Sequence, residues 1–194
     1  YLDHAATTAP DPRVIEAMLP MLTTYWGNPS SIYIEGQEAH RALDSARKLI
    51  ADLLGAAPKE IVFTSGGTES DNAAIRGAAF AQRERGRGTH LITSQVEHHA
   101  VLHAIEQLER EGFTATYLPV DREGVVDLDA LEAAVGPETT LVSVMTANNE
   151  VGTIQPIGQV SRIAKARNPQ VLIHTDAVQA AGTIDITPAA LGVA

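Results

Sequence analysis

The stretch LITSQVEHHAVLHAIEQLEREGFTATYLPV, residues 91–120, contains two short β-prone runs on either side of a helical pattern. The runs are Leu91–Ser94 and Thr116–Val120, and the helical pattern extends from His98 to Glu111. A connection of this length allows two neighbouring strands to run parallel, with the helix crossing one face of the sheet. The stretch therefore predicts a strand–helix–strand unit of the α/β class.

The same alternation continues on both sides of this unit. Further predicted strands are Ile61–Thr64, Leu141–Met145 and Val171–Thr175, and further predicted helices are Gln37–Leu54, Glu69–Arg83, Leu128–Val135 and Ile157–Arg167. Apolar residues recur at helical spacing in the first of these helices, and the strands carry little charge, which is typical of strands covered on both faces. We therefore predict an α/β fold with a mostly parallel sheet and helices on both faces.

Residues 1–35 differ in character from the rest of the chain. The sequence NPSS at residues 28–31 and several other turn-forming residues predict an irregular arm outside the sheet. We expect residues 36–194 to form one large domain. Because the chain closes on LGVA, residues 191–194, without a polar tail, we also expect it to be interrupted inside a fold.

Composition disfavours several classes of function. The formal net charge is −10, and the few clustered cations lie in a Gly-containing stretch, so nucleic-acid binding is disfavoured. No apolar run reaches the length of a membrane span, and residues 1–20 lack the layout of a signal peptide, so we expect a cytoplasmic protein. The chain contains no cysteine, which excludes disulfides and thiolate metal sites.

The first candidate site follows the predicted strand Ile61–Thr64 and reads SGGTES, residues 65–70. Its two glycines allow close approach of the backbone, and Thr68 can cap the helix that follows. Free N–H groups and the dipole at a helix start favour an anion such as phosphate. A plain glycine turn with a capping threonine explains the same residues, and a Walker loop is excluded because no Gly-Lys-Ser/Thr follows.

Asp176 directly follows the predicted strand Val171–Thr175. An acid that ends a buried strand is costly unless it has a charged or hydrogen-bonding partner, and a pyridinium nitrogen would be such a partner. The alternative is an N-cap aspartate for a short helix.

The stretch EHHAVLH, residues 97–103, allows three interpretations. His99 and His103 are spaced one helical turn apart and could bind zinc together with Glu97, although no further ligand lies nearby. His98, at the junction of strand and helix, is better placed to stack on a flat ring and to transfer protons near neutral pH. For His99 and His103 the favoured interpretation is a solvated or capping role.

The loop NNEVGT, residues 148–153, follows the predicted strand Leu141–Met145 and is rich in hydrogen-bonding groups. A loop that needs turns would also contain Asn and Gly, so by itself this is weak evidence for a site.

Taken together, these segments resemble the cysteine desulfurases of the aminotransferase class V group, within the fold-type I enzymes that use pyridoxal phosphate (PLP). The matching blocks are YLDHAATT (1–8), GNPSS (27–31), FTSGGTESDN (63–72), EHHAVL (97–102), ANNEVGT (147–153) and DAVQ (176–179). They occur in the family's order and span nearly the whole chain. The resemblance is closest to the subgroup that serves iron–sulfur cluster assembly and nitrogenase maturation.

The resemblance implies that the cofactor is PLP, held by residues from four blocks. Gly67 and Thr68 would contact its phosphate, Asp176 would pair with the pyridinium nitrogen, and Gln179 would hydrogen-bond the phenolic oxygen. The domain would then be the large domain of a PLP-dependent transferase, without a metal.

Two further residues acquire roles in the same way. His98 would stack on the pyridine ring and is the candidate acid/base for proton transfers at the substrate carbon and sulfur. Asn149 would help to orient cofactor or substrate.

The implied reaction converts L-cysteine to L-alanine, while sulfur passes to an enzyme cysteine as a persulfide. A sulfur-acceptor or scaffold protein of iron–sulfur assembly would receive it, and the complete enzyme would be a homodimer. The Schiff-base lysine of this family belongs to a Ser/His/Lys block, and none of Lys48, Lys59 and Lys165 lies in one. Because the persulfide cysteine is also absent, we expect no turnover from this chain alone.

Two alternatives remain open at this point. A selenocysteine lyase, or another class V lyase or transaminase, would share the phosphate loop, the stacking histidine and the aspartate. A non-catalytic scaffold module could also keep the same fold.

Overall fold

The computed structural model describes residues 1–193, and the chain divides into two compact units, Tyr1–Val62 and Phe63–Ala194. The first unit contains helix α1 (Pro12–Thr23), helix α2 (Ile34–Leu54) and the short 3₁₀ helix η1 (Pro58–Glu60). The boundary between the units thus falls after η1, between Val62 and Phe63, whereas the sequence suggests a boundary at residue 35.

An irregular arm is the wrong description of residues 1–35, because α1 is a regular helix. Asp11 caps it by accepting a hydrogen bond from the Arg13 amide, and Pro12 occupies the first position, where its missing N–H costs nothing. Helix α2 confirms the predicted helix, and Gly55 ends it with a φ of 66°. Its apolar residues Leu49 and Leu53 nevertheless remain exposed.

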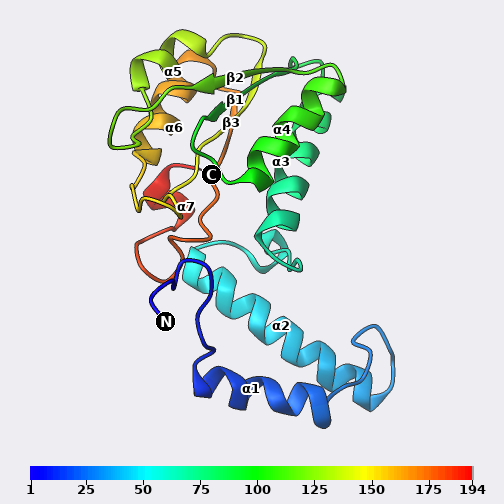
Figure 1. Cartoon of the computed structure of the whole chain (residues 1–194). Helices are drawn as coiled ribbons and strands as arrows, with labels where there is room; N and C mark the ends of the chain where they lie inside the picture. Colours follow the sequence, from blue (N-terminus) through cyan, green and yellow to red (C-terminus); the bar gives the residue numbers. More distant parts are fainter. Residues whose placement is uncertain (194) are drawn as a thin grey trace. The chain divides into compact units, whose positions relative to one another are not determined.

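The second unit contains a sheet of four parallel strands (Figure 1). These are β1 (His90–Ser94), β2 (Thr114–Leu118), β3 (Thr139–Ser143) and β4 (Leu172–His174), in the spatial order β2-β1-β3-β4. The parallel sheet predicted from the sequence is confirmed.

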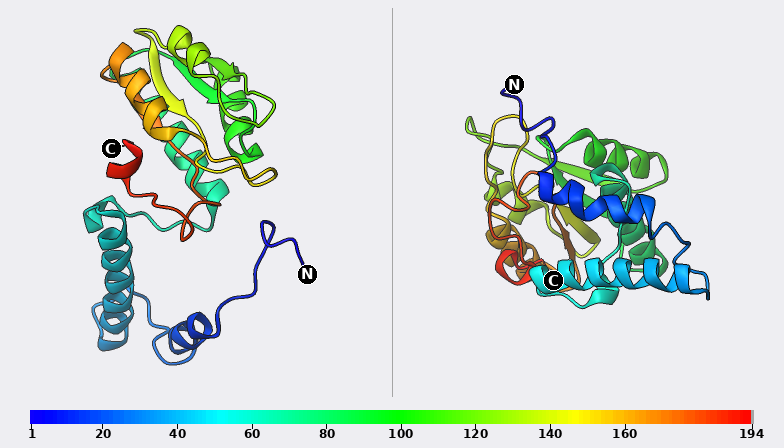
Figure 2. Two further views of the ribbon diagram at one scale, coloured as in Figure 1. Left: turned by 90° about the vertical axis from the view of Figure 1, so that its left-hand side faces the viewer. Right: turned by 90° about the horizontal axis from the view of Figure 1, so that it is seen from below.

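Helices cover both faces of this sheet, as the views in Figures 1 and 2 show. Helices α3 (Gly67–Glu84) and α4 (His99–Arg110) lie on one face, and α5 (Leu128–Ala134) and α6 (Ile157–Arg167) lie on the other, with the short α7 (Pro188–Leu191) beside α6. Alternate strand residues enter the two cores: Leu91 packs with α3 and α4, and Ile92 packs with α5 and α6. Among residues 1–193, no helix is long and apolar enough to cross a bilayer.

The predicted strand Ile61–Thr64 does not form. A strand needs a neighbouring strand for its ladder of backbone hydrogen bonds, and none of the β-ladders among residues 1–193 includes Ile61–Thr64. Val62 and Phe63 are accordingly 77% and 45% exposed. High β-propensity alone therefore does not make a strand here.

The strand order creates a switch point between β1 and β3. The chain leaves β1 for β2 on one side and then crosses to β3 on the other, so connections diverge at the carboxyl ends of β1 and β3. Open α/β sheets bind ligands in the crevice at such a point.

Candidate functional site

The start of α3 is open to an anion. Its N-cap is Gly66, and no side chain of residues 1–193 caps the first turn. The predicted cap by Thr68 is therefore wrong, and Thr68 instead lies exposed inside the first turn. The carboxylate of Glu69 accepts from the Ser65 amide at 2.7 Å and from the Ser65 hydroxyl at 2.6 Å, and these bonds lower the pKa of Glu69. The first-turn amides thus keep the free N–H groups that suit a phosphate.

Gly67 places this helix start directly against the turn that carries Asp176. A Cβ atom at Gly67 would lie 2.8 Å from Cγ2 of Val178, which is too close for any side chain without a shift. Gly66 has no atom within 4 Å of its corresponding position, so the restriction belongs to Gly67. We call the first-turn amides of α3, which include those of Gly67 and Thr68, the anion cradle. The close approach brings this anion cradle near Asp176 within the second unit.

Asp176 follows β4 and is only 8% exposed. Its carbonyl accepts from the Thr146 amide at 2.8 Å, and its Oδ1 accepts from the Val178 amide at 2.9 Å. The residues after it form a turn and not a helix, so the alternative of an N-cap for a short helix does not describe it. A buried carboxylate fixed in this way can meet a cationic partner at the sheet edge.

Sequence reasoning considers Glu97 only as a zinc ligand, whereas the structure makes it a central buried acid of this region. Its Oε1 accepts from the Ser94 hydroxyl at 2.5 Å and from the Met145 amide at 3.0 Å, which joins the ends of β1 and β3 at the switch point. Burial, together with repulsion from Asp176 and Asp71, raises the pKa of Glu97 to about 7. An acid shortly after a buried strand was the signal that could have identified it.

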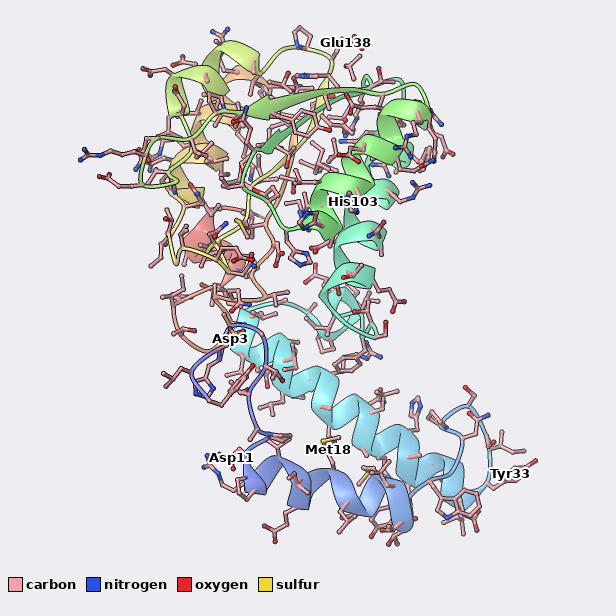
Figure 3. The ribbon with its side chains drawn as sticks, in the orientation of Figure 1. Asp3, Asp11, Met18, Tyr33, His103 and Glu138 are labelled. Carbon is pink, nitrogen blue, oxygen red and sulfur yellow. The ribbon has the colours of Figure 1, made fainter. Side chains whose placement is uncertain are left out.

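His98 is exposed and is the N-cap of α4. Its Nδ1 accepts from the Ala100 amide at 3.1 Å, which assigns the neutral ring's proton to Nε2. His99 and His103 continue along the helix, and His103 is labelled on α4 in Figure 3. Within residues 1–193, no group of three potential ligands could hold a metal ion.

The loop after β3 contains one buried and one half-buried asparagine. Asn148 is the buried one, donating to the Val96 carbonyl at 2.9 Å, so it ties this loop to the segment after β1. Asn149 is half-buried and donates to Glu150 at 3.2 Å. Gln179 is half-buried in the turn after Asp176.

These features define an open α/β protein whose candidate ligand site lies at the carboxyl ends of its strands, where an uncapped helix start, a buried carboxyl group and a histidine lie at one edge of the sheet. The whole chain, residues 1–194, matches the aminotransferase class-V family, and it belongs to that family.

Several named proteins and solved structures are similar to this chain. Cysteine desulfurase IscS of Methanosarcina thermophila is 55% identical over 96% of this chain, which covers 45% of that protein. Among solved structures, a NifS-like protein has a TM-score of 0.95 at 44% identity, with 100% of this chain and 52% of that one covered. A structure titled SspA in complex with cysteine has a TM-score of 0.92 at 40% identity, with 100% and 55% covered. The chain thus spans about half the length of the relatives it matches.

Proposed function

We propose that this chain is the cofactor-binding part of a PLP-dependent cysteine desulfurase. The complete protein would convert L-cysteine to L-alanine and transfer sulfur to an enzyme thiol as a persulfide, for iron–sulfur cluster assembly. The main observation behind the proposal is the close approach of Gly67 to Val178, which places the anion cradle near the buried carboxyl group of Asp176. A phosphorylated pyridine needs both, because its phosphate binds free N–H groups and its ring nitrogen binds an acid. The named relatives support the same reaction.

The residues at this edge fit PLP. The amides of Gly67 and Thr68 would hold the phosphate, Asp176 would keep the ring nitrogen protonated, and Gln179 would donate to the phenolic oxygen. When bound, PLP withdraws electrons from the substrate carbon. The glycine at position 67 leaves room that any Cβ would fill.

His98 and Asn149 would act on the substrate side. Because Nδ1 of His98 accepts from Ala100, its Nε2 is the atom that can donate or receive a proton. Asn149 would orient cofactor or substrate through its amide. In the complete enzyme, which we propose to be a cytoplasmic homodimer, an acceptor or scaffold protein would take the sulfur from the persulfide.

Cysteine is the substrate that the comparisons favour over selenocysteine, since one similar structure is titled as a complex with cysteine. Product analysis of the complete enzyme with each amino acid separates the two. Alanine formation from selenocysteine but not from cysteine would favour the selenocysteine lyase.

The site can be tested with pyridoxine 5′-phosphate, which lacks the aldehyde and therefore needs no lysine to bind. We expect the protein to bind this probe, and Gly67→Ala to weaken binding at least tenfold, because the new methyl group collides with Val178 at the mouth of the cradle. Calorimetric or fluorescence titration measures both dissociation constants.

Gly77→Ala is the matched control. Gly77 lies on the same helix with no atom within 4 Å of an added Cβ, so this change should leave probe binding intact while helix propensity stabilises α3 by about 1 kcal/mol. If the protein does not bind the probe, or if both variants bind it equally well, the proposed site is wrong.

A further inference from the structure

Two polar side chains lie on the α3 face of the sheet, at the carboxyl ends of β3 and β4. Ser143 of β3 and His174 of β4 are partners in the sheet register, and the Ser143 hydroxyl lies 2.9 Å from Nδ1 of His174. The residue two positions before Ser143 on the same face, Leu141, belongs to the apolar core with α3 and α4. Burying polar groups next to such a core costs free energy unless they are hydrogen-bonded, so the partners of these side chains indicate their role.

The other ring nitrogen of His174 faces α3. Its Nε2 lies 3.7 Å from Oδ1 of Asp71, and the two side chains are 16% and 6% exposed. Asp71 lies about one helical turn after Gly67, the residue at the mouth of the cradle. His174 therefore connects β3, β4 and the first turns of the helix that would hold the phosphate.

The electrostatics assign a tautomer to this ring. Burial lowers the pKa of His174 to about 4, although Asp176 opposes this, so the ring is neutral at neutral pH. Burial and then repulsion from Asp176 raise the pKa of Asp71 to about 6, so Asp71 is mostly ionised there. A carboxylate beside Nε2 favours the proton on that atom, which leaves Nδ1 to accept from the Ser143 hydroxyl.

We propose that His174 is a positioning residue for Asp176. As the Nε2–H tautomer, it ties β4 to Ser143 and to Asp71, and so fixes the turn that begins two residues later against the helix start at Gly67. It also directs an N–H group at the charge of Asp71, which leaves Asp176 as the carboxylate that meets the ring nitrogen. This inference rests on the proposed function, because it assigns the ring nitrogen to Asp176.

Two probes isolate the contact at the ring nitrogen: pyridoxine 5′-phosphate and its 1-deaza analogue, in which carbon replaces that nitrogen. We expect the protein to prefer the first by about tenfold or more, as one charge-assisted hydrogen bond would produce. Asp176→Asn should remove most of that preference. His174→Phe should reduce it at least threefold, and His174→Gln, whose amide can still donate to Asp71, should restore part of it.

His90→Phe is the matched control. His90 is also a half-buried strand histidine with both nitrogens bonded, to Thr139 at 2.9 Å and to Thr116 at 2.9 Å, but it lies at the amino end of β1. Loss of the side-chain contacts of His90 there should leave the ratio of the two dissociation constants unchanged. An equal fall of the ratio in both variants would show general loosening of the sheet and would overturn the inference.

The outcomes separate this inference from the proposed function. If the protein binds neither probe, or binds both equally, the proposed function fails. If it discriminates between them and His174→Phe does so equally well, only the inference fails.

Should His174→Phe not fold, Ser143→Ala and Asp71→Asn each remove one of the two contacts, and unchanged discrimination in both overturns the inference. A ¹⁵N spectrum of the wild-type side chains gives an independent readout. A proton on Nδ1 of His174 contradicts the inference, and a proton on Nε2 supports it.

Discussion

At the scale of single residues, Glu97 is an acid held in a site that disfavours its charge. Two donors bond its Oε1, while its Oε2 is buried without a hydrogen-bond partner among the described residues. A carboxyl in this position is most stable when protonated, because the charged form loses its hydration and faces Asp71 and Asp176. The folded protein therefore binds a proton here that the unfolded chain releases at lower pH.

The pH dependence of the free energy of unfolding should reveal the uptake of this proton. Because the folded-state pKa of Glu97 is about 7 against an ordinary 4.5, the folded state binds more protons between these values, and the free energy of unfolding falls as pH rises through them. Glu97→Gln cannot ionise, so relative to the wild type it should gain on the order of 3 kcal/mol between about pH 4.5 and about pH 8. Urea unfolding at both pH values measures the difference.

Glu132→Gln, an exposed change on α5, serves as control and should follow the wild-type pH dependence. If Glu97→Gln follows it as well, the carboxyl of Glu97 ionises normally in the folded protein.

At the scale of elements, the turn before β1 depends on a close backbone contact. Gly88 has a φ of +115°, and a Cβ there would overlap the carbonyl oxygen of Glu138, a residue that Figure 3 labels. That same carbonyl accepts from the His90 amide at 2.9 Å. The glycine thus allows the chain before β3 to approach the start of β1 closely, at the amino ends of the two paired strands.

Replacing this glycine should therefore disturb the central strand pair. We expect Gly88→Ala to lower the free energy of unfolding by about 2–5 kcal/mol, since it adds strain at positive φ to a backbone clash. Gly86→Ala, also at positive φ but with no atom within 4 Å, should cost only about 1–2 kcal/mol. Denaturant unfolding measures both changes. If the two variants lose the same free energy of unfolding, the contact with Glu138 does not contribute to stability.

At the scale of the whole molecule, the chain has the residues that we propose to hold a cofactor, but it lacks two groups that the proposed reaction needs. None of its lysines lies in a Ser/His/Lys block, and it has no cysteine to receive sulfur. In the described structure, Lys165 lies on α6 and donates to the carbonyl of Gly192 at 3.1 Å. We therefore expect this protein to bind the cofactor without catalysing the reaction.

We expect the chain, supplied with PLP and L-cysteine, to form no L-alanine above the rate of free PLP, because it lacks both the covalent anchor and the nucleophile. Amino-acid analysis of the reaction mixture measures alanine, and a full-length cysteine desulfurase is the positive control. Alanine formation at a rate near that of the control would contradict the prediction.

The order of strands and helices in the second unit can be predicted from the sequence, because short β-prone runs of low charge and the helical spacing of apolar residues are local properties of the chain. The sequence also identified Gly67, Asp176 and His98 as residues that follow strand ends or begin helices, and each lies in such a place in the structure.

The folded structure was needed to establish the strand order, to show that Ile61–Thr64 joins none of the described β-ladders, and to find the contacts of Gly67 with Val178 and of His174 with Ser143 and Asp71. Each of these depends on residues far apart in sequence meeting in space, and no local pattern encodes which partner a strand, a buried carboxyl or an imidazole will meet. The importance of Glu97 was missed for the same reason: its burial is produced by the strands and loops around it.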